Sequence, residues 1–125
     1  MAGRGRRLDH ALRQVGPPGD LAALGIDAEP AVPLDAEVRE LVTTSAERDH
    51  LGGELAGTIV FSAKEAFYKA WSSCGGELLG FDDVDAELRA DGTFAIRPRS
   101  GPPSWPGRWA VRDGFVVTAA WTTAP

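Results

Sequence analysis

Two acidic residues separated by a single residue, Asp27 and Glu29, lie in a stretch whose pattern is typical of a β-strand. The segment at residues 21–30, LAALGIDAEP, is apolar as far as Ile26 and then alternates, which predicts Ile26 and Ala28 on the core side. Residues at positions i and i+2 of a strand share a face, so two carboxylates there repel unless a cation or a basic group neutralises them. Mg²⁺ prefers oxygen ligands of this kind, although a solvated strand edge also explains the pair.

A second group of polar residues lies on a predicted amphipathic helix that contains residues 61–71, FSAKEAFYKAW. Two interpretations stay open here. Ser62 and Glu65 can form a capping box at the helix start, with Glu65 also paired to Lys69 one turn later. Alternatively, Glu65 is a third carboxylate for the same cation, and Lys64 and Lys69 neutralise phosphate oxygens of a substrate. The polar face carries four residues: Lys64, Glu65, Tyr68 and Lys69.

The elements that must position these residues predict an α+β fold. Strands and helices do not alternate regularly, so we expect an antiparallel sheet packed against one main helix and shorter helices. Asp-Gly pairs at 91–92 and 113–114 predict two hairpins. The tryptophans are expected to pack in the core or on the hairpins rather than to stack on a ligand. The remaining predicted helices are residues 34–42 and about 45–51, and the remaining strands are 81–88, 93–98, 107–112 and 115–121.

Composition excludes several function classes. The 125 residues are 43% hydrophobic with a net charge of −5, which suits a globular domain and disfavours a nucleic-acid binder. No apolar run is long enough to cross a bilayer, and the first residues lack the apolar core of a signal peptide, so a cytoplasmic location without membrane attachment is expected. Residues 1–19 predict an irregular basic segment, and residues 20–125 a single domain.

Together, the two polar segments resemble the 4′-phosphopantetheinyl transferases, in particular the group that includes the enterobactin synthetase D component and the surfactin-type enzymes. That family reads G-[IV]-D-x-E in the first segment and [FW]-[ST]-x-K-E-[AS]-x-x-K-[AL] in the second. This chain has GIDAE at residues 25–29 and FSAKEAFYKA at residues 61–70. The resemblance covers roughly residues 20–121, and it implies one half of a fold made of two similar halves.

Such enzymes move the phosphopantetheine arm of coenzyme A onto a serine of an apo acyl or peptidyl carrier protein. The carriers serve fatty acid, polyketide or nonribosomal peptide synthesis, siderophores included. Coenzyme A is thus the implied substrate, and Mg²⁺ or Mn²⁺ the implied cofactor. The implied metal ligands are Asp27, Glu29 and Glu65. The implied coenzyme A contacts are Lys64 and Lys69 on phosphate oxygens and Tyr68 along the arm.

The resemblance also implies which groups are catalytic: Lys69 by its charge on the phosphates, and Glu65, or a water held by the metal, as the base for the carrier serine. Family members run to about two domains of ordinary length, and their first half has no counterpart here. His10 is the one candidate for the family's phosphate-contacting histidine, but its sequence context differs.

Three explanations of the short length stay open: a truncated enzyme, self-association that rebuilds the site, or a degraded relative. The expected function is Mg²⁺-dependent phosphopantetheine transfer. The alternative is a non-catalytic module that binds Mg²⁺ and coenzyme A, or a carrier protein.

Overall fold

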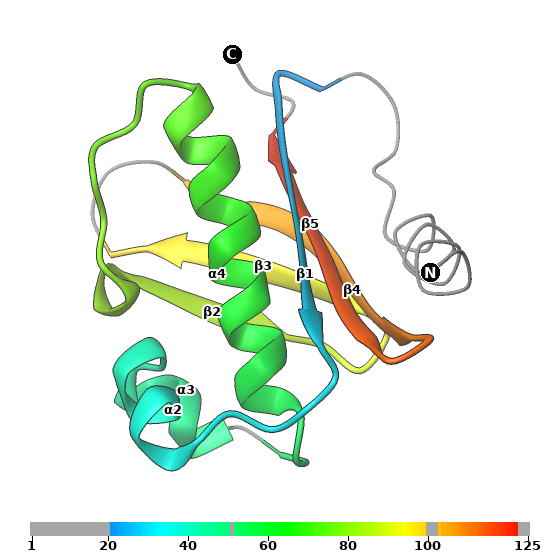
Figure 1. Ribbon diagram of the computed structural model, residues 1–125. Coiled ribbons are helices and arrows are strands. Elements are labelled where there is room, and N and C mark those ends of the chain that lie inside the picture. The colour runs from blue at the N-terminus through cyan, green and yellow to red at the C-terminus, as the bar shows by residue number, and fades with distance from the viewer. Residues whose placement is uncertain (1–20, 51, 100–102, 123–125) are drawn as a thin grey trace.

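The computed structural model describes residues 21–50, 52–99 and 103–122 (Figure 1). The predicted basic segment at residues 1–19, with His10, lies outside the described residues. Among the described helices, none is long and apolar enough to cross a bilayer. The elements in chain order are β1 (Ala23–Pro30), α2 (Ala36–Val42), α3 (Ser45–His50), α4 (Ala56–Ser73), the 3₁₀ turn η1 (Phe81–Asp83), β2 (Val84–Leu88), β3 (Thr93–Pro98), β4 (Trp105–Arg112) and β5 (Phe115–Thr122).

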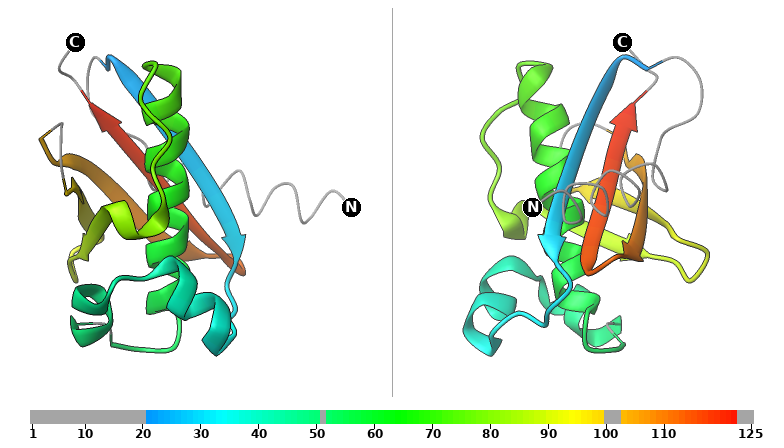
Figure 2. Two further views of the ribbon diagram at one scale, coloured as in Figure 1. Left: turned by 90° about the vertical axis from the view of Figure 1, so that its left-hand side faces the viewer. Right: turned by 45° about the vertical axis from the view of Figure 1, so that its right-hand side comes forward.

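The five strands form one antiparallel sheet in the order β1-β5-β4-β3-β2. Helix α4 runs across one face of this sheet, and α2 and α3 lie near the N-terminal end of α4 (Figures 1 and 2). The predicted α+β class, with one main helix on an antiparallel sheet, is confirmed. Because β1 is the first strand in this order, the strand that carries Asp27 and Glu29 lies at an edge of the sheet.

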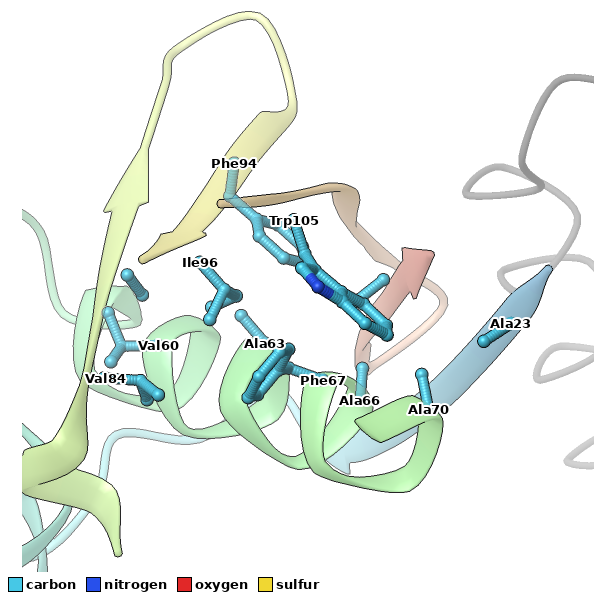
Figure 3. Close-up of a cluster of buried hydrophobic side chains, with 12 residues drawn as sticks. Ala23, Val60, Ala63, Ala66, Phe67, Ala70, Val84, Phe94, Ile96 and Trp105 are labelled. Atoms are coloured by element: carbon cyan, nitrogen blue, oxygen red, sulfur yellow. The ribbon is translucent and has the colours of Figure 1, made fainter. Parts of the chain in front are cut away.

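The core fills the space between α4 and the sheet. Phe67 is fully buried and packs edge-on against Trp105, with ring centroids 5.2 Å apart. Phe94 and Ile96, on β3, add buried side chains from the sheet (Figure 3). A smaller cluster on the opposite face includes Trp121, so the two tryptophans pack as predicted. Strand β4 begins at Trp105, two residues earlier than expected.

Gly25 explains how closely α4 approaches β1. A Cβ built on Gly25 would lie 1.8 Å from the backbone oxygen of Ala66 and 2.8 Å from the backbone nitrogen of Ala70, distances that no real side chain tolerates. The glycine that opens the G-I-D-x-E segment therefore lets the helix backbone rest directly on the strand. This contact brings the polar residues of both segments together.

The second hairpin depends on two residues with positive φ. Asp113 and Gly114 have φ angles of 54° and 83°, as the type I′ turn between antiparallel strands requires. Both Asp-Gly hairpins predicted from the sequence are confirmed, since β2 pairs with β3 and β4 pairs with β5.

Two sequence predictions, about the start of α4 and the facing of β1, are wrong. Helix α4 begins at Ala56, six residues before Ser62, so Ser62 does not cap it. The expected facing of β1 is reversed, because Ile26 is 41% exposed whereas Asp27 is 6% exposed and faces the helix.

Candidate active site

Asp27 lies at the centre of the polar residues between β1 and α4. It is opposite Thr118 in the β1–β5 register, and both side chains are buried. Asp27 Oδ2 accepts a hydrogen bond from Ser62 Oγ at 2.8 Å, and Asp27 Oδ1 forms an ion pair with Lys69 Nζ at 3.0 Å. Lys69 Nζ also donates to the backbone oxygen of Ile26 at 2.9 Å. Lys69 therefore pairs with the strand aspartate rather than with Glu65 as the helical spacing suggested.

Glu29 and Glu65 complete a group of three carboxylates around this ion pair. Burial raises the pKa of Glu29 to about 7, assisted by a hydrogen bond to Asp27 and by the charges of Asp27 and Glu65. Burial and the charge of Asp27 raise the pKa of Glu65 as well, while Lys69 opposes both shifts. Within the described residues, Lys69 is the cation that opposes these shifts, while neighbouring carboxylates add to the effect of burial. Asp27 and Lys69 are in direct contact, and Glu29 and Glu65 are close enough to influence each other and this pair electrostatically; the assignment of the three carboxylates as metal ligands stays a prediction.

The three carboxylates offer the oxygen ligands that a hard divalent cation prefers, but they are not arranged in the coordination geometry of a metal site. Within the described residues, no set of three or more His, Cys, Asp or Glu side chains is arranged to hold a metal ion. The oxygen atoms of Asp27, Glu29 and Glu65 are nevertheless the ligands that Mg²⁺ and Mn²⁺ prefer. Burial is the largest cause of the raised pKa values of Glu29 and Glu65, and repulsion from neighbouring carboxylates adds to it; a bound cation would relieve that repulsion.

Lys64 does not take the role expected of it. Its side chain is fully buried, and its ammonium group donates to Glu47 Oε1 at 2.9 Å, the backbone oxygen of Val42 at 3.0 Å and that of Phe81 at 2.7 Å. Desolvation by this burial lowers the pKa of Lys64, while Glu47 counteracts the shift. All three donors are used inside the protein, so the expectation that Lys64 contacts substrate phosphates is corrected to a structural role.

Glu47 is the important residue that the sequence reasoning missed. Its carboxylate accepts hydrogen bonds from the backbone nitrogens of Thr44 at 2.6 Å and Ala86 at 2.5 Å, besides Lys64. The backbone nitrogen of Glu47 in turn binds Thr44 Oγ1 at 3.1 Å, which is a capping box at the start of α3. The T-x-x-E spacing at residues 44–47 was the signal that could have found this box, which the prediction placed at Ser62 and Glu65 instead.

Tyr68 borders the carboxylates on the exposed side of α4. Its hydroxyl donates to the backbone oxygen of Gly80 at 2.6 Å, and burial strongly raises its pKa. The ring meets Phe81 at 5.6 Å between centroids, and Phe81 meets Phe61 at 5.8 Å. Phe61 and Tyr68 lie on the helix face that also carries Glu65, and Phe81 packs against both of them from η1. Tyr68 thus ties the segment around η1 to the helix beside the site.

A cavity of about 690 Å³ lies elsewhere, between the N-terminal end of α4 and the β2–β3–β4 part of the sheet. Its walls include Ile59, Leu88, Arg97 and Trp109, and none of the predicted site residues lines it. The carboxylate group is therefore a surface site at the sheet edge rather than part of this cavity.

The sequence of this chain matches a known protein family. Residues 23–120 match the family model described as the 4′-phosphopantetheinyl transferase superfamily. The chain belongs to this superfamily. The match includes both β1 and α4, and therefore all six of the predicted site residues.

Three curated phosphopantetheinyl transferases are similar to this chain. The 4′-phosphopantetheinyl transferase Svp of Streptomyces mobaraensis is 38% identical over 122 residues, covering 85% of this chain and 50% of that protein. The corresponding transferase PptT of Mycobacterium tuberculosis is 36% identical, covering 78% of this chain and 51% of that protein. Npt of Nocardia iowensis is 33% identical, covering 78% and 53%. The chain spans about half the length of these relatives.

Proposed function

We propose that this chain takes part in transfer of the 4′-phosphopantetheine arm from coenzyme A to a serine of an apo acyl or peptidyl carrier protein. The observation that carries the proposal is the meeting of Asp27, Glu29, Glu65 and Lys69, which come from two segments about forty residues apart. Membership of the superfamily supplies the reaction class. The proposal includes the cytoplasmic location expected from the sequence.

In this proposal, Asp27, Glu29 and Glu65 hold a Mg²⁺ or Mn²⁺ ion. When bound, such an ion neutralises charge on the pyrophosphate of coenzyme A. Lys69 contacts phosphate oxygens in this proposal. Its side chain is 54% exposed, and the ion pair with Asp27 holds its ammonium group beside the carboxylates. Tyr68 and its aromatic neighbours border the path of the pantetheine arm.

The chemical step proposed is an in-line displacement at phosphorus. The oxygen of the carrier serine forms a bond to the phosphorus that carries the pantetheine arm, and the bond from this phosphorus to the bridging oxygen of the pyrophosphate breaks. 3′,5′-ADP leaves with the bonding electron pair. Glu65 accepts the serine proton, a role that its raised pKa favours because a more basic carboxylate takes up a proton more readily.

Self-association belongs to the same proposal, because the chain spans about half of each relative. Several large apolar side chains are exposed near the site and along α2, which a partner surface could cover. Those on β1 and α2 are Leu24, Ile26, Val38 and Leu41. The alternative function is a module that binds a carrier protein or a Mg²⁺–coenzyme A complex without catalysing transfer. The observation that favours it is that the chain spans about half the length of its relatives.

The test is the mass of an apo carrier protein after incubation with the chain, coenzyme A and Mg²⁺. The expected result is addition of one phosphopantetheine group, at a rate below that of a full-length relative. Asp27→Asn and Glu65→Gln should abolish the addition, whereas Glu77→Gln, a change at an exposed acidic residue after α4, should leave it intact. No addition at saturating coenzyme A, despite measurable Mn²⁺ binding, would favour the binding module.

A further inference from the structure

A chain of buried hydroxyl groups leads from Asp27 into the interior of the protein. Ser62 and Thr118 have no exposed surface, and their hydroxyl oxygens lie 2.8 Å apart. Thr118 Oγ1 also lies 2.9 Å from the backbone oxygen of Ser62, to which it donates. The chain joins three elements, because Asp27 is on β1, Ser62 on α4 and Thr118 on β5.

The direction of the hydrogen bonds follows from the carboxylate. Ser62 Oγ donates its single hydroxyl hydrogen to Asp27 Oδ2. Thr118 is then the donor toward Ser62, and its single hydroxyl hydrogen is shared between the backbone oxygen and the hydroxyl oxygen of Ser62 in a bifurcated hydrogen bond. Thr118 therefore strengthens the donor that binds Asp27, because linked hydrogen bonds polarise one another in a buried setting.

The geometry leaves Asp27 with two different carboxylate oxygens. Oδ2 is committed to Ser62 in the interior, while Oδ1 faces Lys69, whose side chain is half exposed. A carboxylate held at one oxygen keeps its other oxygen in a fixed direction and pays less conformational entropy when it binds a ligand.

We propose that Ser62 and Thr118 are positioning residues that fix the Asp27 carboxylate for cation binding. Neither residue touches the cation; both act through Asp27. This inference rests on the proposed function, because it assumes that Asp27 is a metal ligand. Partners of metal-binding carboxylates typically change metal affinity by about 10- to 100-fold when they are removed.

The experiment is a titration of the purified chain with Mn²⁺, followed by the paramagnetic broadening of water relaxation or by calorimetry. Thr118→Val keeps the shape of the side chain and removes the hydroxyl, and Ser62→Ala removes the donor to Asp27. Both should weaken Mn²⁺ binding by about 10-fold or more. Thr118→Ser keeps a hydroxyl at the same position and should restore most of the affinity.

Thr58→Val is the matched control. Thr58 is also buried, lies on α4 and donates its hydroxyl hydrogen to the backbone oxygen of Val32 at 2.6 Å, away from Asp27. Its loss should lower stability in urea without changing Mn²⁺ affinity. Equal affinities for Thr118→Val and Thr58→Val would overturn the inference while leaving the metal site intact. A wild-type chain that binds no Mn²⁺ would instead overturn the metal assignment of the proposed function, and the positioning role with it.

Discussion

The two lysines of the second motif should respond very differently to replacement by methionine. Lys64 is fully buried and paired with a buried Glu47, whereas the side chain of Lys69 is 54% exposed. Lys64→Met keeps the length and apolar stem but leaves the Glu47 charge buried, with only two backbone donors remaining. Breaking one side of a buried ion pair costs about 3–5 kcal/mol of unfolding free energy.

Lys69→Met supplies the comparison in the same helix. Its ion pair with Asp27 is half open to water, so its loss should cost at most about 1 kcal/mol. Asp27 keeps its hydrogen bond from Ser62 in this variant. The stability cost of Lys69→Met should therefore be several-fold smaller, whereas coenzyme A binding should be lost because the exposed ammonium group is gone.

Urea unfolding, followed by tryptophan fluorescence, measures both changes. With a slope of about 2 kcal/mol per molar urea, Lys64→Met should lower the midpoint by about 2 M and Lys69→Met by at most about 0.5 M. Coenzyme A binding is measured on the same samples by calorimetry. A Lys64→Met chain as stable as the wild type, or a Lys69→Met chain equally destabilised, would refute the assignment of one lysine to structure and the other to substrate.

Three further outcomes are expected. Gly25→Ala places a methyl group against the backbone of Ala66, so it should lower the unfolding free energy by about 3 kcal/mol or more, whereas Gly52→Ala, with open space around it, should change it little; urea unfolding compares the two. The folded chain holds a proton on Glu29 more tightly than the unfolded chain, because the pKa rises from 4.5 to about 7. This contribution to stability is full below about pH 4.5 and is lost as the pH rises through 7, so Glu29→Gln should flatten the fall in urea midpoint between about pH 5 and 8. Finally, analytical ultracentrifugation at micromolar concentration should show a dimer or larger species, and a monomer at every concentration would contradict the proposed self-association.

The sequence predicted the strands and the approximate place of the main helix because periodicity and Asp-Gly turns are local signals. Through the resemblance of two short motifs, it also selected Asp27, Glu29, Glu65 and Lys69, which the structure places near one another; their roles in binding stay predictions. It could not predict which lysine is buried. Lys64 and Lys69 were both placed on the polar face of the predicted helix, and the packing of α3 and η1 around Lys64 distinguishes them.

Two other errors have the same physical origin. Ser62 has the sequence of a helix cap, but tertiary contacts extend α4 to Ala56 and give the serine hydroxyl to Asp27 instead. The facing of β1 was reversed because apolar Ile26 was assumed to be inside. At a site, buried polar partners overrule the ordinary preference of apolar residues for the interior.

The pairing of β1 with β5 has a consequence for how the chain is made. The first described strand joins the last, so Asp27 and Thr118 meet across a separation of roughly ninety residues, and closing so long a loop is entropically costly. During synthesis, the ribosome must release β5 before the Asp27 carboxylate can acquire its final surroundings. Until then both edges of β1 are unpaired, because β5 is its partner strand in the sheet. A nascent chain that stalls before β5 would carry both sequence motifs and still lack the assembled site.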